Sequence, residues 1–284
     1  MAITFLSRRC NTLCVVLLCL ALLAGGIASA EERPTASRSQ ADLHAFVNWN
    51  FRHRRKLQGW HATAIAIRRT LEQCYPRRSA FTLVENGPGG ALRAFLHALP
   101  IARGSDVSFV YLASHQSPEG KWDFVQRGLE SMSTIVTEAG VPRHPNRIVI
   151  LDTCFAESVR KDPAWDREMQ SATLFAASAT EETQELDFST PQPIDLRRRY
   201  PAAAAWLDAH MGREWNGRLS FLGFVWVQTF VTSRIPPTDE KGWADFLKRC
   251  ERNADEFRKN GDRRLASQVS FVPADERRVH TRER

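Results

Sequence analysis

The 284-residue chain lacks the short motifs that mark several common kinds of catalytic site. It contains no C-x-x-C or H-E-x-x-H pair, no G-x-S-x-G segment, and no glycine-rich loop followed by Lys and Ser or Thr. The usual spacings for zinc, thioredoxin-type redox chemistry, serine hydrolysis and P-loop phosphate binding are therefore missing. The histidines show no metal-ligand spacing either, so we predict no metal and no cofactor.

Cysteine is scarce, and half of it lies in a segment that should not be interpreted as fold. Three of the six cysteines occur within the first 19 residues. There Arg8 and Arg9 precede an apolar run over 14–26 and the small-residue pattern Ala28-Ser29-Ala30, which is typical of a signal peptide. We predict that residues 1–30 are removed and that the mature chain is exported, to the periplasm or outside the cell. The apolar run is too short for a stable membrane span.

The mature chain would keep Cys74, Cys154 and Cys250. An odd number of cysteines in an exported protein implies a free thiol or a bridge between chains. If Cys74 and Cys250 pair, Cys154 is the thiol that stays free.

The chain has no single stripe of one charge, although its net charge is +7. Its basic residues are densest in three separate clusters, at 52–56, 197–199 and 277–284. Scattered basic clusters are typical of solvated loops, and the chain has no recognisable nucleic-acid-binding motif. We therefore predict no nucleic-acid partner.

Strand-like and helix-like patterns alternate along the mature chain. This order predicts an α/β fold, a mostly parallel sheet with helices on both faces, in one domain over 43–273. A polar linker, 31–42, would precede it and a flexible basic tail, 274–284, would follow. The expected strands are 44–51, 81–85, 107–113, 148–151, 172–178 and 268–272. The expected helices are 59–74, 91–99, 128–139, 215–232 and 242–259. We expect 180–199 to be an exposed connection.

Two of the strand-like runs end on a reactive side chain. One run stops at His115 and another stops at Cys154. Because the carboxyl ends of adjacent parallel strands open into one crevice, these two side chains could meet there. A thiol becomes a good nucleophile when a neighbouring imidazole helps to deprotonate it. The pattern thus favours a Cys/His catalytic dyad.

The order of these elements resembles that of the caspase-like cysteine peptidases, a superfamily that includes caspases, metacaspases and legumains. The most specific segment is Leu151–Ala156 (LDTCFA), followed by Tyr111–Gly120 (YLASHQSPEG) and Ala176–Glu182 (AASATEE). The resemblance covers nearly all of the mature chain. It implies a cysteine endopeptidase that cleaves protein or peptide substrates and needs no cofactor.

The resemblance also implies roles for individual residues. Cys154 would be the nucleophile and His115 its acid–base partner. The backbone N–H groups of Gln116 and Cys154 would bind the oxyanion. Asp152 and Ser178 would contact the substrate, with Asp152 selecting a basic residue at P1, the substrate position before the cleaved bond.

Two other interpretations stay open at this point. The family usually has Gly after the catalytic His, where this chain has Gln116, and often Gly three positions after the Cys, where it has Glu157. A catalytically inactive caspase-like binding module is therefore one alternative. An exported structural or interaction protein with a similar order of strands is the other. Asp152 by itself could equally cap the turn that follows it.

Overall fold

The computed structural model describes the segments that build a central sheet and the helices around it. All described residues belong to one compact unit, 36–284. The described residues are 42–50, 58–76, 78–85, 89–99, 106–114, 121–124, 128–131, 147–154, 173–178, 185–189, 195–233, 237–260 and 269–272. The predicted signal peptide and the predicted basic tail lie outside them, as does nearly all of the predicted linker.

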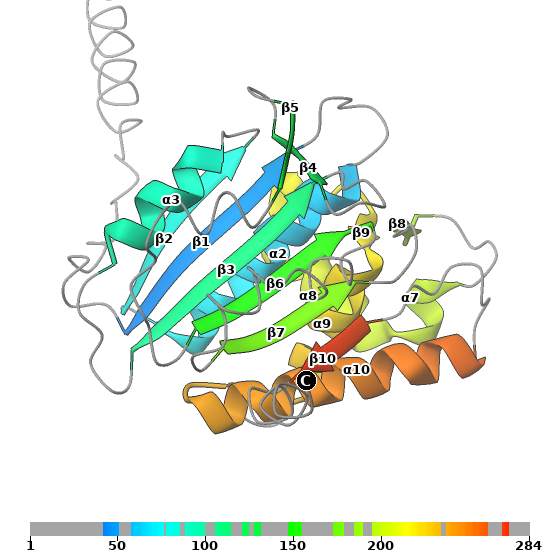
Figure 1. Ribbon diagram of the computed structural model, residues 1–284. Coiled ribbons are helices and arrows are strands. Elements are labelled where there is room, and N and C mark those ends of the chain that lie inside the picture. The colour runs from blue at the N-terminus through cyan, green and yellow to red at the C-terminus, as the bar shows by residue number, and fades with distance from the viewer. Residues whose placement is uncertain are drawn as a thin grey trace, which may run out of the picture. The chain divides into compact units, whose positions relative to one another are not determined.

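A six-stranded sheet forms the centre of this unit (Figure 1). Its strands run in the order β10-β7-β6-β3-β1-β2, and all neighbouring pairs are parallel except β10 with β7. The mostly parallel sheet that the sequence predicts is confirmed. The strands are β1 (Leu43–Asn50), β2 (Ser79–Glu85), β3 (Val107–Ser114), β6 (Arg147–Thr153), β7 (Thr173–Ser178) and β10 (Val269–Val272).

The two central strands β3 and β6 are buried at every residue. Their sequences are almost continuously apolar, which is typical of parallel strands that are covered on both faces. Alternate residues of each strand point to opposite faces of the sheet, so each strand contributes to two cores. Such strands form a rigid frame for whatever residues follow their ends.

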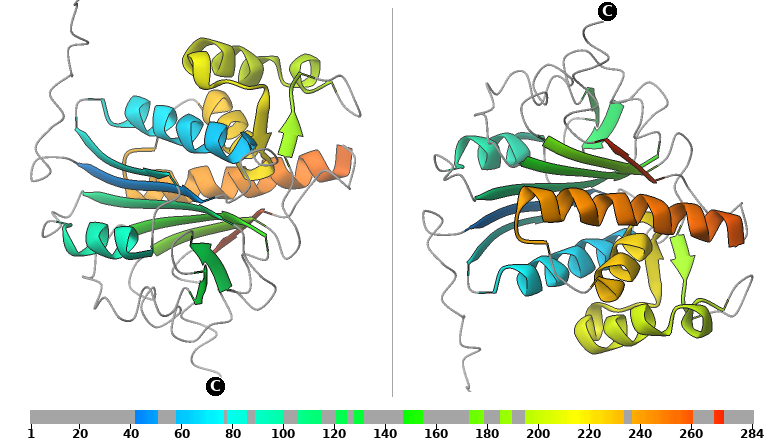
Figure 2. Two further views of the ribbon diagram at one scale, coloured as in Figure 1. Left: turned by 90° about the horizontal axis from the view of Figure 1, so that it is seen from above. Right: turned by 90° about the horizontal axis from the view of Figure 1, so that it is seen from below.

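Helices cover both faces of the sheet, as the sequence predicts (Figure 2). On one face lie α2 (Gln58–Cys74), α9 (Phe221–Thr232) and α10 (Glu240–Asn260), and α3 (Gly89–His97) lies on the other. Phe46 of β1 contacts Phe95 of α3 with ring centroids 5.3 Å apart. The rings of Phe109 in β3 and Trp226 in α9 are 5.7 Å apart on the opposite face. Two cores therefore hold the sheet between them.

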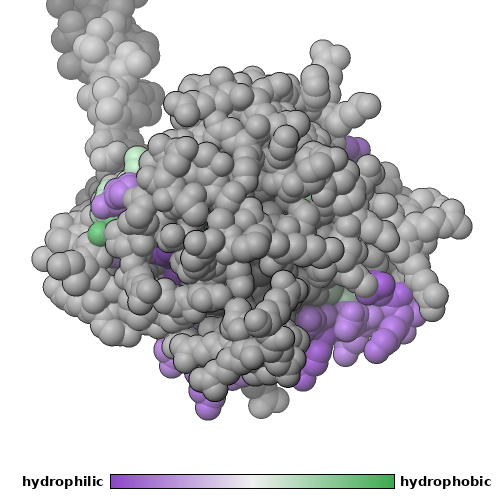
Figure 3. All heavy atoms as spheres, in the orientation of Figure 1, coloured by the Kyte–Doolittle hydropathy of each residue, from purple (hydrophilic) through white to green (hydrophobic). Residues whose placement is uncertain are grey.

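Helix α10 is amphipathic. Its buried side chains recur at helical spacing and face the sheet, while the outer face is hydrophilic (Figure 3). The buried residues are Trp243, Phe246, Leu247, Cys250, Ala254 and Phe257. This periodicity explains why the helix could be predicted from the sequence with nearly correct ends.

Helix α9, in contrast, is apolar almost all round and lies inside the helical layer. Every residue from Phe221 to Val227 is buried. Gly223 allows the close approach of α2, since a Cβ atom at this position would collide with the side chain of Thr63. A helix that is apolar almost all round is typical of a position in the core. Among the described residues, no helix is both long and apolar enough to cross a membrane.

Two expected helices are wrong in part. Residues Gly128–Ser131 form strand β5, which pairs antiparallel with β4 (Lys121–Phe124), whereas we expected a helix over 128–139. Residues 132–139 lie outside the described residues. The expected helix over 215–232 begins only at Phe221. In both places a short segment gains its hydrogen bonds from a partner strand, which local periodicity cannot reveal.

The segment expected as an exposed connection, 180–199, contains secondary structure in its described residues, 185–189 and 195–199. It contains β8 (Glu185–Asp187), which pairs antiparallel with β9 (Arg218–Ser220), and the short helix α7 (Leu196–Arg199). Helix α8 (Pro201–His210) follows directly. Residues 190–194 of this segment lie outside the described residues.

Candidate active site

The ends of β3 and β6 are adjacent in the sheet. The two strands are parallel neighbours, and Ser114, the last residue of β3, is the register partner of Thr153, the last residue of β6. Neighbouring strands lie about 4.8 Å apart. Cys154 follows Thr153 directly, and His115 follows Ser114. The backbone thus places Cys154 at the edge of the sheet where β3 also ends; His115 lies outside the described residues, so its place beside Cys154 stays a prediction.

This edge is also where the direction of winding of the sheet changes. From β1 the chain passes to β2 on one side of β1, and then to β3 on the other side. Ser114 is the register partner of Asn50, the last residue of β1. In open α/β sheets, ligands bind outside the carboxyl ends of the strands at such a switch point. The general rule and the predicted dyad therefore indicate the same place.

Cys154 differs from the two other described cysteines in its exposure. None of the three is in a disulfide bond; Cys154 is partly exposed, while Cys74 and Cys250 are buried. Burial raises the pKa of the Cys74 thiol to about 12 and that of Cys250 to about 12 as well, so both stay protonated. The Cys74–Cys250 bridge that the sequence left open is not formed, since both are free cysteines buried in the hydrophobic core. Among the three described cysteines, Cys154 is therefore the one that is accessible to a reagent or a substrate.

Asp152, two residues before Cys154, has a fully buried side chain at 0% exposure. Its Oδ2 atom accepts hydrogen bonds from Tyr111 Oη at 2.8 Å and from Ser220 Oγ at 2.5 Å. Burial, together with the carboxyl group of Asp152, holds the pKa of Tyr111 well above its ordinary value. The tyrosine hydroxyl therefore stays protonated and donates a hydrogen bond to Asp152.

Ser220 extends this contact into the helical layer. Its Oγ accepts a hydrogen bond from Gly223 N at 2.9 Å and so caps the N-terminus of α9. Its backbone N–H donates to Thr63 Oγ1 of α2 at 2.9 Å, and the Thr63 hydroxyl donates to Gly59 O at 2.7 Å. A buried polar network thus joins the end of β6 to β3, α9 and α2.

The sequence analysis missed Tyr111, Ser220 and Thr63 as parts of this network. Each is a hydroxyl residue inside an otherwise apolar segment, and each is fully buried or nearly so. A buried hydroxyl needs a partner, so this pattern is the only sequence signal that could have indicated them.

The structure also bears on the predicted substrate contacts. The enclosed position of Asp152 favours a structural role over contact with a substrate, so its role in P1 selection stays a prediction. Ser178 is the last residue of β7, and its neighbour Ala177 pairs with Leu151 of β6. Ser178 therefore lies at the same edge of the sheet as Cys154. Gln116 and Glu157 lie outside the described residues.

No metal centre is found in the described part of the chain, where His, Cys, Asp and Glu form no group of three that could hold an ion.

The comparisons with known proteins give likeness to solved structures and none by sequence. No protein-family model matches the chain, and no match is found among curated proteins. Among solved structures, the chain is similar to the crystal structure of caspase-1 from Spodoptera frugiperda. The TM-score is 0.47 at 10% sequence identity, over 83% of this chain and 86% of that chain.

Proposed function

We propose that this chain is a cysteine endopeptidase that uses Cys154 as its nucleophile and His115 as its acid–base partner. The observation that carries the proposal is the pairing of Ser114 with Thr153, the residues that directly precede the two reactive side chains. A dyad needs its two members on adjacent, rigid supports, and β3 and β6 are both buried along their full length.

In the proposed reaction, the Cys154 thiolate attacks the carbonyl carbon of the scissile peptide bond. The oxyanion that forms is bound by the backbone N–H groups of Cys154 and Gln116. His115 protonates the amine as the C–N bond breaks, which leaves an acyl group on the Cys154 sulfur. Water, deprotonated by His115, then hydrolyses this thioester and frees the thiol.

Thiol reactivity tests the dyad directly. We expect iodoacetamide to label Cys154 in the folded protein, and Cys74 and Cys250 only after unfolding, because these two are buried. His115→Ala should lower the rate of labelling near pH 6 by about tenfold or more, since an isolated thiol with a pKa of about 8.5 is almost fully protonated there. The exposed His97 on α3 supplies a matched control, His97→Ala, which should leave the rate unchanged.

Cleavage of a broad peptide library under reducing conditions is the second test. Cys154→Ala and His115→Ala should each abolish cleavage and leave thermal unfolding nearly unchanged. If the wild type cleaves nothing although Cys154 labels readily, the chain is the inactive binding module instead. If the rate of labelling does not depend on His115, the dyad is refuted.

The preference at P1 is a separate part of the proposal. From the resemblance, we propose cleavage after Arg or Lys, with Asp152 as the residue that selects them. Asp152→Asn would then reduce kcat/KM for Arg substrates far more than for Asn substrates, on the order of 10–100-fold. Equal losses on both substrates would instead assign Asp152 to positioning the Cys154 segment through Tyr111 and Ser220.

Export of the mature chain is likewise a proposal, carried by the signal-like pattern of residues 1–30. Expression of the full chain, followed by fractionation and N-terminal sequencing, tests it. Protein recovered outside the cytoplasm should begin near Glu31, and uncleaved protein in the cytoplasm would contradict the proposal.

A further inference from the structure

Strand β2 forms one edge of the central sheet (Figure 1). It pairs with β1, and no second strand pairs with it in the described part of the chain. The outer side of an edge strand presents a row of backbone N–H and C=O groups, which another chain can use for pairing. With seven residues, β2 is long enough for several such hydrogen bonds.

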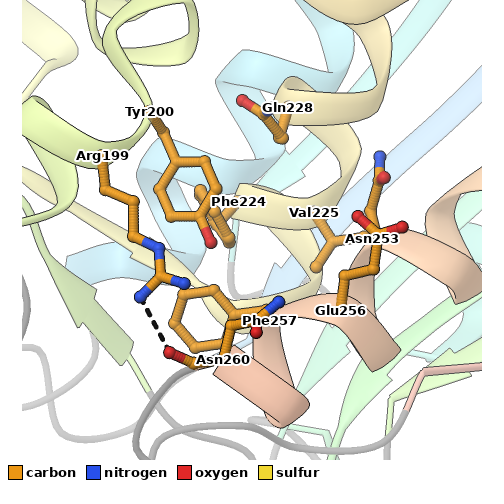
Figure 4. Close-up of a pocket in the computed structure, with 9 residues that line it drawn as sticks. All are labelled: Arg199, Tyr200, Phe224, Val225, Gln228, Asn253, Glu256, Phe257 and Asn260. Carbon is orange, nitrogen blue, oxygen red and sulfur yellow. Dashed lines mark hydrogen bonds between the residues drawn. The ribbon is translucent and has the colours of Figure 1, made fainter.

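The opposite edge of the sheet is protected against pairing of this kind. Its strand β10 has only four residues, and α10 packs beside it. The C-terminal end of α10 is held in turn by α7, where Arg199 Nη1 donates to Asn260 O at 2.9 Å (Figure 4). A very short strand and a helix alongside are common ways in which proteins blunt a sheet edge.

Strand β2 is longer, and its sequence carries no such protection. The segment 79–84 contains no charged residue and no proline, which are the residues that usually prevent an edge from pairing. Leu83 is 37% exposed and is the one exposed large apolar side chain among the described residues. An apolar side chain on an uncharged edge strand marks a surface that is suited to contact another chain.

Phe81 and Leu83 form a short apolar strip on the α2 side of this edge. Alternate residues of a strand share a face, and the register partners of these two are Ala45 and Val47, which belong to the core on that side. Helix α2 packs mainly over β1 and β3, so it covers the strip only in part. The guanidinium carbon of Arg68 in α2 lies 5.7 Å from the centroid of the Phe81 ring.

The strip is complementary to a second copy of itself. When two β2 strands run antiparallel about a two-fold axis at Thr82, Phe81 of each strand lies opposite Leu83 of the other. Ser79 lies opposite Glu85 in the same register. Directly opposed side chains of an antiparallel pair are in contact, so the two apolar strips would cover each other.

The charges at the two ends of β2 favour the antiparallel direction. Arg78, which precedes the strand, and Glu85, its last residue, are both exposed. Arg78 Nη1 lies 2.8 Å from Asp42 Oδ2, a contact that keeps the guanidinium at this end of the strand. Antiparallel pairing brings the end with Arg78 close to the end with Glu85, whereas parallel pairing would bring like charges together.

We propose that two copies of this chain pair through β2, so that their two six-stranded sheets form one continuous sheet across a two-fold axis at Thr82. The pairing occupies the β2 edge of both copies, so the assembly closes as a dimer. Strands β1 and β3 separate this interface from β6, the strand that precedes Cys154. The assignment therefore does not depend on the peptidase activity proposed above.

A cysteine at position 82 tests the register. Opposed residues of an antiparallel pair have Cα atoms about 4.5–5.5 Å apart, which lies within the range of disulfides. In a full-chain background where Cys154 and the three cysteines before residue 20 are replaced by Ala, Thr82→Cys should form a covalent dimer under mild oxidation. Phe81→Cys and Leu83→Cys should cross-link when the two proteins are mixed, and far more slowly when each is alone.

Sedimentation velocity of the full-chain protein measures the interface without a cross-link. The wild type should be a dimer at micromolar concentrations. Leu83→Lys places a charge against Phe81 of the other copy and should raise the dissociation constant by about tenfold or more. Ala205→Lys is the matched control, because it adds the same charge at an exposed position of α8 and should leave the dissociation constant unchanged.

Thermal unfolding of Leu83→Lys separates a loss of pairing from a loss of fold, and the fold should survive because the side chain is exposed. The proposal is overturned if the wild type is a monomer throughout the micromolar range, which would leave another segment or a different protein as the occupant of this edge. It is also overturned if Leu83→Lys dimerises as tightly as Ala205→Lys does. A Thr82→Cys protein that forms no more covalent dimer than its background would refute the register and with it the proposal.

Discussion

Replacing Ser220 with Ala removes the side chain that joins the nucleophile strand to the helical layer. The Ser220 hydroxyl donates to Asp152 Oδ2 at 2.5 Å and accepts from Gly223 N at 2.9 Å, and Ser220 is 0% exposed. The side chain is closed off from bulk solvent, which therefore does not replace either bond. Ala leaves the backbone contact with Thr63 in place, so the substitution isolates the hydroxyl.

The expected loss follows from these two hydrogen bonds. Removing a serine N-cap costs about 1 kcal/mol. Losing a hydrogen bond to a carboxylate costs about 1.5–3 kcal/mol more. The free energy of unfolding should therefore fall by about 2.5–4 kcal/mol, and Tm should fall by roughly 5–15 °C for a domain of this size.

Urea unfolding of wild type and Ser220→Ala measures this loss. Ser233→Ala is a matched control at the other end of α9, where the partly buried serine hydroxyl donates to Thr229 O at 2.6 Å. It should cost no more than about 1 kcal/mol. A double-mutant cycle with Asp152→Asn should give a coupling of about 1 kcal/mol or more, because the two side chains are in direct contact.

Three results would refute this reasoning. One is a Ser220→Ala protein within 1 kcal/mol of wild type, which is less than the cap alone should cost. Another is a loss no larger than that of Ser233→Ala. The third is a coupling of zero with Asp152→Asn, which would mean that Ser220 and Asp152 do not interact in solution.

Two further predictions concern the core. Gly223→Ala places a Cβ atom against the side chain of Thr63, so α9 must move away from α2. Urea unfolding should therefore show a free energy of unfolding that is lower by about 1–3 kcal/mol. An unchanged stability would contradict the close approach of the two helices. Burial raises the pKa values of the Cys74 and Cys250 thiols to about 12. Their contribution to stability should therefore be constant below about pH 8 and fall between about pH 9 and pH 12, because the unfolded chain loses these protons first. The slope should approach about 1.4 kcal/mol per pH unit for each thiol, and Cys74→Ala should make it shallower; an equal slope in this variant would refute the role of that thiol.

The long buried elements could be predicted from the sequence because the local pattern of apolar residues indicates which side chains are buried. Helix α10 shows this most clearly, since its apolar residues recur at helical spacing over its whole length. The apolar runs of β3 and β6 are equally clear. In contrast, Gly128–Ser131 and Arg218–Ser220 are too short to have a period of their own, and a distant partner strand determines their structure.

The candidate site, too, could be predicted from the sequence only in part. The residue types and their position after predicted strands were enough to nominate Cys154 and His115, and the adjacency of those strands is confirmed. The surroundings of Asp152 could not be predicted. Its partners Tyr111 and Ser220 lie 41 and 68 residues away in the chain, so no local pattern connects them to it.

The sequence alone therefore determined the alternation of strands and helices, the parallel sheet that follows from it, and the reactive residue types at two strand ends. The tertiary structure decided the register that pairs Ser114 with Thr153, the separate burial of Cys74 and Cys250, and the direction in which the Asp152 carboxyl group points. The physical reason is that periodicity records how each segment meets solvent and core. Hydrogen-bond partners far apart along the chain meet only after those segments have packed.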